Sequence, residues 1–428
     1  MTITPLDRRI AAATGTEKAE RGAIEAYQLQ RLRETVSRAR RSSRFYRRLL
    51  ADFDPESLDS LSKLAALPFT LPSDVASAPY DFLCVSPRDV ERIVTVTTSG
   101  TTGRPKRVFF TQGDQERTID FFHHGMSTFT APEDTVMICM PCDTPGGVGD
   151  LLARGLRRLG CRVVPYGPIA DYGDAVAALL RENVTVLVAI PCQALSLARR
   201  MMARGVRHRL HSVLLSADYI PAPSAAIVEK AWGARLFPHF GMTETGYGGA
   251  VACKAGAGMH IREADLIFEI VDPVSLTPLE DGAVGELVVT TLTREAMPLI
   301  RYRTGDLASL TSERCPCGSA VRRLERVYGR IQSAVALRGG GLVSPHALDD
   351  ALWADEAVLA WSARLKSAPE GETLVVTVEA EPFDEERLRD AVRRALIAPP
   401  GAAPEIVVER GAAEFFTTGT LKRTIAFQ

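Results

Sequence analysis

The sequence predicts an α/β protein: a large N-terminal domain with mostly parallel sheets and a β-rich subdomain, followed by a small α+β C-terminal domain. Three observations predict this class. Short β-branched or apolar runs alternate with longer Ala/Leu/Arg stretches from Arg92 to Thr243, helical patterns fade after Ala264, and strands and helices mix again after Pro345. Strands that alternate with helices favour a parallel sheet covered on both faces.

Length supports a division into domains. A rule of about 150 residues per domain allows two or three domains in a chain of 428 residues, and we predict two. The N-terminal domain is expected over residues 1–328, with its β-rich subdomain over about 250–328. The C-terminal domain is expected over residues 329–428.

Charge and hydropathy exclude several function classes. Lys and Arg total 51 against 52 for Asp and Glu, so no basic excess exists to neutralise nucleic-acid phosphates. No apolar run approaches the roughly 18 residues of a membrane helix, and the first 30 residues lack the apolar core of a signal peptide. We therefore expect a cytoplasmic protein with no nucleic-acid or membrane partner and with reduced cysteines.

The predicted elements begin with a helical cap. Leu29, Leu32 and Val36 recur at helical spacing within the stretch from Gly22 to Ala66. Short strands then alternate with helices long enough to cross between parallel strands. The predicted strands are Ile93–Thr97, Val136–Met140, Arg162–Pro165, Val184–Ile190, Ser212–Ser216 and Arg235–Pro238. The predicted helices are Gly146–Leu159, Tyr172–Glu182, Gln193–Arg204 and Ala222–Trp232.

Strand patterns separated by turns such as Asp281-Gly282 predict the β-rich subdomain. Its strands are Leu266–Val271, Gly285–Thr291 and Ala308–Thr311. The C-terminal domain is predicted to mix both element types. It contains a helix after Pro345, strands at Val358–Leu365 and Thr373–Glu379, a helix at Asp384–Leu396 and a strand at Glu405–Glu409.

A loop rich in hydroxyls and glycines follows the first predicted strand. It reads Thr97-Thr98-Ser99-Gly100-Thr101-Thr102-Gly103-Arg104-Pro105-Lys106. Glycines permit close backbone approach, amides and hydroxyls donate to phosphate oxygens, and a lysine supplies a compact positive charge. The loop therefore suits a polyphosphate, although the order of a Walker A loop is absent. A Ser/Thr/Gly surface turn is the alternative.

Five segments in a fixed order carry a family resemblance. The loop TSGTTGRPK resembles the phosphate loop of the adenylate-forming superfamily, which contains acyl-CoA synthetases, luciferases and peptide-synthetase adenylation domains. The later matches are FGMTETG at 240–246, GELVVT at 285–290, YRTGD at 302–306 and Gly329-Arg330. The short length and the CPCG segment at 315–318 are most similar to the phenylacetate-CoA ligase branch.

This resemblance implies a reaction and its ligands. Such an enzyme uses ATP and Mg²⁺ to convert a carboxylic acid, expected here to be aromatic, into acyl-AMP and pyrophosphate, and then transfers the acyl group to coenzyme A. Two alternatives stay open: a stand-alone adenylating enzyme that loads an acyl carrier protein, and a nucleotide-binding pseudoenzyme. The oligomeric state also stays open, with a dimer as one alternative.

The resemblance also assigns roles to residues. Ser99, Gly100, Thr101, Thr102, Gly103 and Lys106 are expected to hold the β- and γ-phosphates. Glu244 is expected to ligate Mg²⁺, Thr243 to contact the α-phosphate, and Asp306 and Arg330 to bind the ribose, for which a carboxylate offers only acceptors. The adenine pocket is expected to be lined by Ser216, Ala217, Asp218, His239 and Phe240, and Gly241 and Met242 are expected to belong to the same ATP- and AMP-binding site.

The C-terminal domain departs from the family pattern. The segment Thr418-Gly419-Thr420-Leu421-Lys422-Arg423 has Thr420 where the family places a lysine that contacts the substrate carboxylate. Lys422 lies two residues away and would share a face with Thr420 in an extended segment, so we expect Lys422 to replace that lysine. A solvated terminal charge is the alternative.

Two features are expected to serve movement of this small domain, which the family swings about a hinge. Gln332 stands where the family often has the hinge aspartate, and its backbone can still rotate. The run Gly339-Gly340-Gly341 would let a coenzyme A chain pass over bare backbone, although a plain turn explains it as well. The resemblance therefore implies a mobile C-terminal domain.

Cysteines and a histidine within the predicted β-rich subdomain suggest a metal centre. Cys315 and Cys317 form a C-x-C-G knuckle, and Cys253 and His260 lie upstream. Three thiolates and one imidazole make a closed, structural tetrahedral zinc set. The alternative is that these cysteines are small buried hydrophobes.

The acyl pocket is predicted only by segment. Residues 139–150 follow a strand and would border the acid, so Asp143, Gly146 and Gly147 are candidates for its wall. Asp143 could pair with an amino or hydroxyl group of the substrate. A turn or helix-cap aspartate is the alternative.

Overall fold

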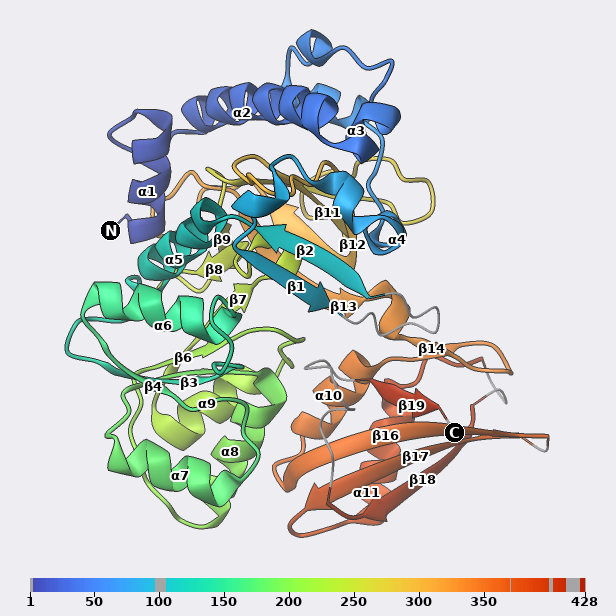
Figure 1. Ribbon diagram of the computed structural model, residues 1–428. Helices are drawn as coiled ribbons and strands as arrows, with labels where there is room; N and C mark the ends of the chain where they lie inside the picture. Colours follow the sequence, from blue (N-terminus) through green and yellow to red (C-terminus); the bar gives the residue numbers. More distant parts are fainter. Residues whose placement is uncertain (1–2, 97–104, 370, 400–402, 413–423, 428) are drawn as a thin grey trace. The chain divides into compact units, whose positions relative to one another are not determined.

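The computed structural model describes residues 3–96, 105–369, 371–399, 403–412 and 424–427. Its mixed α/β architecture confirms the predicted fold class (Figure 1). The chain divides into two compact units that alternate along the sequence. The first unit contains Met1–Asp134, Pro141–Val163 and Phe237–Val327, and the second contains Thr135–Met140, Val164–Leu236 and Tyr328–Gln428. The predicted domain boundary at residues 328 and 329 stays a prediction.

The first unit is built on antiparallel strands. Its larger sheet has the strand order β10-β11-β12-β13-β9-β8-β7, and β1 and β2 pair separately. The strands are β1 (Arg92–Val96), β2 (Lys106–Phe110), β7 (Arg235–Phe240), β8 (Ala250–Ala252), β9 (Met259–Ile261), β10 (Leu266–Val271), β11 (Gly285–Thr291), β12 (Tyr302–Thr311) and β13 (Arg323–Arg330). The first predicted strand, Ile93–Thr97, thus forms a hairpin ladder with β2 and does not join a parallel sheet.

Helices of the first unit come mostly from the N-terminal region. They are α1 (Pro5–Thr14), α2 (Arg21–Ser42), α3 (Arg44–Leu49), α4 (Pro72–Ser77), α5 (Gln112–Met126) and α6 (Val148–Leu159), with 3-10 turns η1 (Pro55–Ser57), η2 (Leu61–Ala66), η3 (Pro79–Phe82), η4 (Pro87–Asp89) and η5 (Thr243–Thr245). The predicted continuous helical cap over 22–66 is therefore wrong in detail. Ser43 ends α2 and caps α3, and 3-10 turns begin at Pro55 and Leu61.

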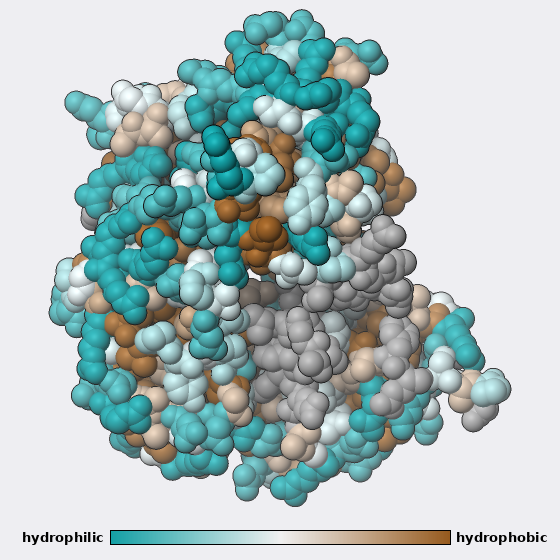
Figure 2. Space-filling view, viewed as in Figure 1, coloured by the Kyte–Doolittle hydropathy of each residue, from teal (hydrophilic) through white to brown (hydrophobic). Residues whose placement is uncertain are grey.

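Helix α2 is amphipathic. Its buried side includes Leu32, Val36 and Ala39, and Figure 2 shows mostly hydrophilic residues on the outer face of this region. The buried side packs in a core with Tyr46 from α3 and Phe110 from β2. Apolar burial of this kind contributes about 25 cal/mol per Å² and is non-directional, so hydrogen bonds must fix the register of the packed segments.

Hydrogen bonds of Tyr46 set the position of β12. The Tyr46 hydroxyl accepts from Ile300 N at 2.9 Å and contacts Thr70 Oγ1 at 2.9 Å. Thr70 Oγ1 in turn donates to Ile300 O at 2.7 Å. The N-terminal helices thereby hold the start of β12, which carries Tyr302, in a fixed place.

The second unit contains the parallel ladders that the sequence predicts. Strands β3 and β5 pair in parallel, as do β5 and β6, in the order β6-β5-β3-β4. Its elements are β3 (Thr135–Cys139), β4 (Arg162–Pro165), α7 (Tyr172–Arg181), β5 (Val186–Ala189), α8 (Pro191–Ala203), β6 (Ser212–Leu215) and α9 (Ser224–Trp232). Each agrees with a predicted element to within two residues at either end, as local patterns normally allow.

The C-terminal part of the second unit is a mixed sheet with two helices. Its sheet order is β18-β17-β16-β19. The elements are η6 (Ile331–Ser333), β14 (Val335–Ala336), β15 (Leu342–Val343), α10 (Pro345–Trp353), β16 (Val358–Ala368), β17 (Gly371–Ala380), α11 (Glu385–Ala395), β18 (Glu405–Arg410) and β19 (Ile425–Phe427). Among the residues described, no helix is both long and apolar enough to cross a membrane.

Candidate active site

Three polar side chains from distant segments meet inside the first unit. Lys106 begins β2, Glu244 lies in η5, and Tyr302 begins β12. Lys106 Nζ forms an ion pair with Glu244 Oε1 and donates to the Tyr302 hydroxyl at 2.9 Å. The Tyr302 hydroxyl donates to Glu244 Oε1 at 3.0 Å. We call these three residues the Lys106 cluster.

Because the three side chains are buried, the electrostatic interactions among them are strong. Relative exposures are 8% for Lys106, 4% for Glu244 and 1% for Tyr302. Burial alone would raise the pKa of Glu244, but the Lys106 ammonium and its hydrogen bond outweigh burial, and the pKa of Glu244 lies below its ordinary value. Glu244 is therefore an anion at neutral pH, ready to exchange its lysine partner for another cation.

The backbone around Glu244 is specified by two glycines. A Cβ on Gly241 would lie 2.1 Å from Tyr247 O, and Gly246, which follows η5, has φ of 72°. The Arg294 guanidinium donates to Glu244 O at 3.0 Å and lies 4.4 Å from the centroid of the Phe110 ring. The FGMTETG segment is thus a tight turn that directs Glu244 toward Lys106.

Asp306 is buried further along β12, the strand that carries Tyr302. The bend before it depends on Gly305, which has φ of 74°. Glu286 on β11 accepts from Gly305 N at 3.1 Å and holds the Arg303 side chain at 2.8 Å. The YRTGD segment is therefore held by the neighbouring strand β11, as a binding residue on a strand requires.

His239 and Phe240 end β7 in the first unit. The His239 ring packs near Phe121 and Phe122, with centroid distances of 5.9 and 6.2 Å. Burial lowers the pKa of His239 to about 4. His239 is therefore neutral at physiological pH, which suits a flat, uncharged wall.

The depressed pKa of His239 predicts acid sensitivity. The folded pKa lies below the ordinary value of 6.5, so the unfolded chain binds more protons and stability is lost as pH falls from about 6.5 toward 4. Between pH 7 and pH 5, urea unfolding should show that wild type loses about 2 kcal/mol more than His239→Gln. Equal losses in the two proteins would contradict this expectation.

Several predicted site residues belong to the second unit. Ser216, Ala217 and Asp218 directly follow β6, and Ala217 has φ of 76°, a conformation that costs a non-glycine residue about 1 kcal/mol or more. Arg330 ends β13, and the exposed Gln332 lies in η6. Their predicted adenine, ribose and hinge roles stay predictions.

The Gly339-Gly340-Gly341 run forms the turn between β14 and β15. Gly340 N donates to Leu337 O at 3.0 Å, and Leu337 N donates to Gly341 O at 3.1 Å. Gly340 and Gly341 have φ of 84° and 104°, so glycine is needed for the turn itself. Passage of coenzyme A over this backbone stays a prediction.

The predicted acyl-pocket segment leads into α6. Asp143 is exposed, and Gly147 is the residue before α6. Gly146 has φ of 70°, donates to Asp150 Oδ2 at 2.8 Å, and would clash through a Cβ with Gln115 Nε2 at 2.6 Å. Local structure thus explains why glycine occupies these two positions. An acyl-binding role for this segment stays a prediction.

Some predicted phosphate and carboxylate ligands cannot be placed. Ser99, Gly100, Thr101, Thr102, Gly103 and Lys422, together with Thr420, lie outside the described residues. Lys106 is the member of the phosphate loop that the structure describes, and Thr243 lies beside Glu244 in η5.

The four predicted zinc ligands converge in the first unit. The ligand atoms of Cys253, His260, Cys315 and Cys317 all lie within 4.8 Å of one another. The pairing of β9 with β13 brings the segments together, because it sets His260 opposite Arg323, shortly after the cysteine knuckle. Cys253 Sγ lies 3.6 Å from Cys315 Sγ, and Cys317 Sγ lies 3.6 Å from His260 Nε2.

These spacings fit a tetrahedral zinc ion. Zn–S distances of about 2.3 Å and Zn–N distances of about 2.1 Å imply ligand-to-ligand separations of roughly 3.6–3.8 Å. The separation between Cys253 and Cys315 matches this range and exceeds that of a disulfide. The donor set is three thiols and one imidazole, with no position left for a substrate.

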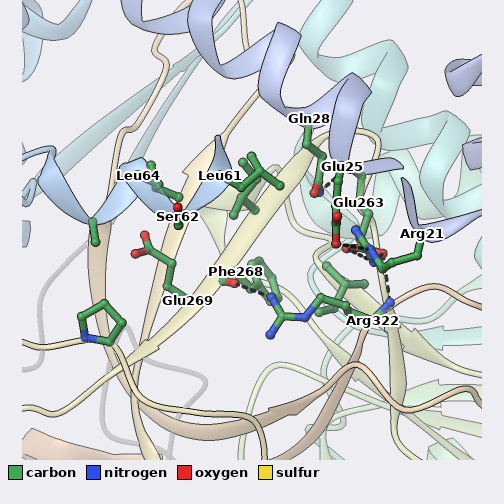
Figure 3. A pocket seen from close by; sticks show the side chains of 14 residues that line it. Arg21, Glu25, Gln28, Leu61, Ser62, Leu64, Glu263, Phe268, Glu269 and Arg322 are labelled. Atoms are coloured by element: carbon green, nitrogen blue, oxygen red, sulfur yellow. Dashed lines mark hydrogen bonds and ion pairs between the residues drawn. The ribbon is translucent and has the colours of Figure 1, made fainter. Parts of the chain in front are cut away.

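A separate pocket of about 220 Å³ lies between α2, η2 and strands β9, β10 and β13 (Figure 3). Its charged side chains already have partners, some of them outside the pocket. Arg21 makes two hydrogen bonds to Glu263, and Glu263 also accepts from Arg322 N. Glu269 pairs at 3.0 Å with Arg301, which does not line the pocket. These interactions occupy the charged groups, so we assign the pocket a structural role.

Sequence reasoning missed several residues that build these sites. Tyr302 belongs to the YRTGD motif, yet nothing local indicates that its hydroxyl bridges Lys106 and Glu244. Arg294, which holds the Glu244 backbone, lies in no recognised motif. Asp7 contacts His260 at 3.4 Å, and only the capping-box spacing of Thr4 and Asp7 was visible in the sequence.

Comparison with solved structures identifies the fold. A 2-hydroxyisobutyryl-CoA ligase in the postadenylation state, in complex with 2-HIB-AMP, superposes with a TM-score of 0.78 at 22% identity, covering 95% of this chain and 89% of that one. The same ligase with 2-HIB-AMP and CoA in the thioesterification state has a TM-score of 0.67. The chain therefore has the fold of this CoA ligase.

Sequence comparison then gives the family. The profile of the AMP-binding enzyme family matches residues 41–293. The phenylacetate-coenzyme A ligase of Thermus thermophilus is 32% identical over 335 residues, or 76% of this chain and 74% of the relative. That of Escherichia coli K12 is 31% identical over 74% of this chain and 73% of its own length. The chain belongs to the AMP-binding enzyme family, which confirms the resemblance to adenylate-forming enzymes.

Proposed function

We propose that the protein is an acid–thiol ligase that activates a carboxylic acid with ATP and transfers the acyl group to coenzyme A. The observation that carries this proposal is the buried Lys106 cluster, whose three residues lie on three of the segments that resemble the family motifs. The relatives of this chain described above are named phenylacetate-coenzyme A ligases, and these names support an aromatic acid as the substrate.

The chemistry proceeds in two half-reactions. A carboxylate oxygen attacks the α-phosphorus of ATP, pyrophosphate leaves, and acyl-AMP forms. The thiol of coenzyme A then attacks the acyl carbonyl, AMP leaves with the bonding electrons, and the thiol proton goes to solvent or a base. Both steps concentrate negative charge, so fixed cations and donors supply most of the acceleration.

Lys106 and Glu244 would separate to accept Mg²⁺ and ATP. Mg²⁺ would neutralise phosphate charge, and hard oxygen ligands such as the Glu244 carboxylate suit it. The Lys106 ammonium would then donate to phosphate oxygens. Tyr302 would keep a hydrogen bond to each of them as they separate, while Asp306 would accept from the ribose hydroxyls.

We further propose that the cysteine and histidine ligands hold a structural Zn²⁺. The convergence of the ligand atoms of Cys253, His260, Cys315 and Cys317 within 4.8 Å of one another supports it, as does the burial of three of the four residues. Zinc would cross-link the loop after β8 to the turn before β13. It would stabilise the unit and take no part in acyl transfer.

Pyrophosphate release tests the proposed reaction. We expect wild type to release pyrophosphate with ATP and an arylacetic or other aromatic acid, and to form a thioester with CoA. Asp306→Ala should raise KM for ATP by about tenfold or more, because a buried acceptor for the ribose is lost. Thioester formed on a holo-carrier protein and absent with CoA would contradict the proposed acceptor.

The same assay tests whether Lys422 compensates for Thr420, which stands where the family places a lysine. Lys422→Ala should reduce acid-dependent pyrophosphate release by about 10²-fold if Lys422 supplies the charge that Thr420 lacks. Thr420→Lys in the Lys422→Ala background should restore part of the rate. Unchanged release in Lys422→Ala would exclude Lys422, and silence of wild type with every acid would favour the pseudoenzyme.

A further inference from the structure

The cysteine and histidine cluster contacts the N-terminal helix α1 through one carboxylate. His260 Nδ1 lies 3.4 Å from Asp7 Oδ1, while His260 Nε2 lies 3.6 Å from Cys317 Sγ. The two ring nitrogens therefore have different partners: Nδ1 contacts the helix and Nε2 contacts the thiols. Both Asp7 and His260 are only 1% exposed.

The Asp7 carboxylate also caps the N-terminus of α1. Asp7 Oδ2 accepts from Thr4 N at 3.0 Å and Asp7 N donates to Thr4 Oγ1 at 3.1 Å, as a capping box requires. Asp7 Oδ1 accepts from Ser319 Oγ at 2.5 Å. Because Ser319 lies two residues after Cys317, Asp7 contacts both segments that carry the metal-binding groups of His260 and Cys317.

We propose that Asp7 is the outer partner of the zinc ligand His260 and that zinc binding anchors helix α1 to the first unit. This inference rests on the proposed zinc centre. Asp7 would accept the Nδ1 proton, which fixes the tautomer and leaves Nε2 free to bind the metal. Carboxylate partners of this kind orient histidine ligands and strengthen metal binding.

Coupling between the metal and the helix must be reciprocal. If zinc binds more tightly when Asp7 is docked, then zinc must also favour the docked helix by the same factor. The remaining attachments of α1 are modest: the buried side chains of Leu6, Ile10 and Ala11, and an ion pair from Arg9 to the half-buried Asp120. Such a short terminal helix can open locally without unfolding the unit.

Helix α2 is fastened independently of the metal centre. Arg21 makes two hydrogen bonds to Glu263, and Gln28 Nε2 donates to Glu263 O and Leu266 O at 2.9 and 3.2 Å (Figure 3). Thr35 Oγ1 donates to Leu292 O at 2.8 Å. Loss of zinc should therefore loosen α1 and leave α2 in place.

The test combines zinc affinity with amide hydrogen exchange of the full-length protein. Chelator competition should show a zinc dissociation constant about 10- to 100-fold higher in Asp7→Asn than in wild type. Removal of zinc from wild type should speed exchange of the α1 amides by about fivefold or more, with little change in α2. Neither readout depends on catalytic activity.

Two variants separate the metal role of Asp7 from its capping role. Thr4→Ala removes the cap partner and leaves the contact between Asp7 and His260, so it should speed exchange in α1 with zinc affinity within about twofold of wild type. Arg21→Gln loosens the start of α2 and should also leave zinc affinity unchanged. If Asp7→Asn binds zinc as tightly as Thr4→Ala does, the inference is overturned.

The remaining outcomes are also decisive. Wild type that binds zinc but shows the same α1 exchange with and without it would overturn the anchoring of α1, even if Asp7→Asn failed to fold. Wild type that binds no zinc would refute the proposed metal centre and this inference together. Pyrophosphate release would be unaffected by that result, so the proposed ligase activity would stand separately.

Discussion

Glu244→Gln is expected to lower kcat/KM for Mg²⁺ and ATP by about 10²- to 10³-fold, the usual cost of removing one positioned charge from a transition state. Glu244 is buried, and Lys106 keeps the pKa of its carboxyl below the ordinary value, so the amide removes a full negative charge. Glutamine keeps the shape and can still accept from Lys106. Acid-dependent pyrophosphate release over a Mg²⁺ titration would measure the loss.

A matched variant controls for the loss of any buried glutamate. Glu269 is largely buried in the first unit, with its side chain 14% exposed, and pairs with Arg301 at 3.0 Å, away from the Lys106 cluster. Glu269→Gln should lower the unfolding temperature while kcat/KM stays within about threefold of wild type. Glu244→Gln with near-normal kinetics and normal Mg²⁺ dependence would contradict the assigned role.

The alternation of strands and helices predicts the second unit well because the apolar residues of each element there follow the spacing typical of its type. Strand β5 is a short, fully buried apolar run, and α7 begins directly after the capping residue Asp171. Strand β2 and helix α5 were not predicted. Helix α5 has a polar first turn and aromatic residues near its end, and its burial is set by contacts with α6 and α1.

Prediction of the candidate site depended on how far apart its members lie in the chain. Lys106 and Glu244 were found because each lies in a recognisable motif, although 138 residues separate them. The link from Lys106 to Tyr302 spans 196 residues and is created by the packing of β2 and β12 around the core that includes Tyr46. Local spacing carries no information about such a contact.

The convergence of the proposed zinc ligands was predictable because short spacing carries chemical information. A C-x-C-G knuckle is compact enough to offer two thiolates by itself, and the predicted subdomain limited the search for the remaining ligands. The antiparallel pairing of β9 and β13 then completes the set. The contact of Asp7 with His260 spans 253 residues and follows from the docking of α1, which no motif encodes.

Cys315→Ser is expected to abolish the metal centre, reducing bound zinc from about one equivalent to less than about a tenth. Cys315 Sγ lies 3.6 Å from Cys253 Sγ, so it occupies a position that a tetrahedral ion needs. A serine hydroxyl is a far poorer zinc ligand than a thiolate, since it stays protonated near neutral pH. Metal analysis of the purified protein measures the loss directly.

Stability should change with metal content. Zinc that binds only the folded unit stabilises it by about 4 kcal/mol when free zinc exceeds the dissociation constant 1,000-fold, so Cys315→Ser should lower the unfolding temperature by about 5 °C or more. Cys161→Ser is the matched control, since Cys161 is buried in the same unit and its thiol donates to Ala131 O at 3.2 Å. Its zinc content should equal that of wild type. Equal zinc content and stability in the two variants would show that Cys315 is a buried hydrophobe, because a true ligand must affect both properties.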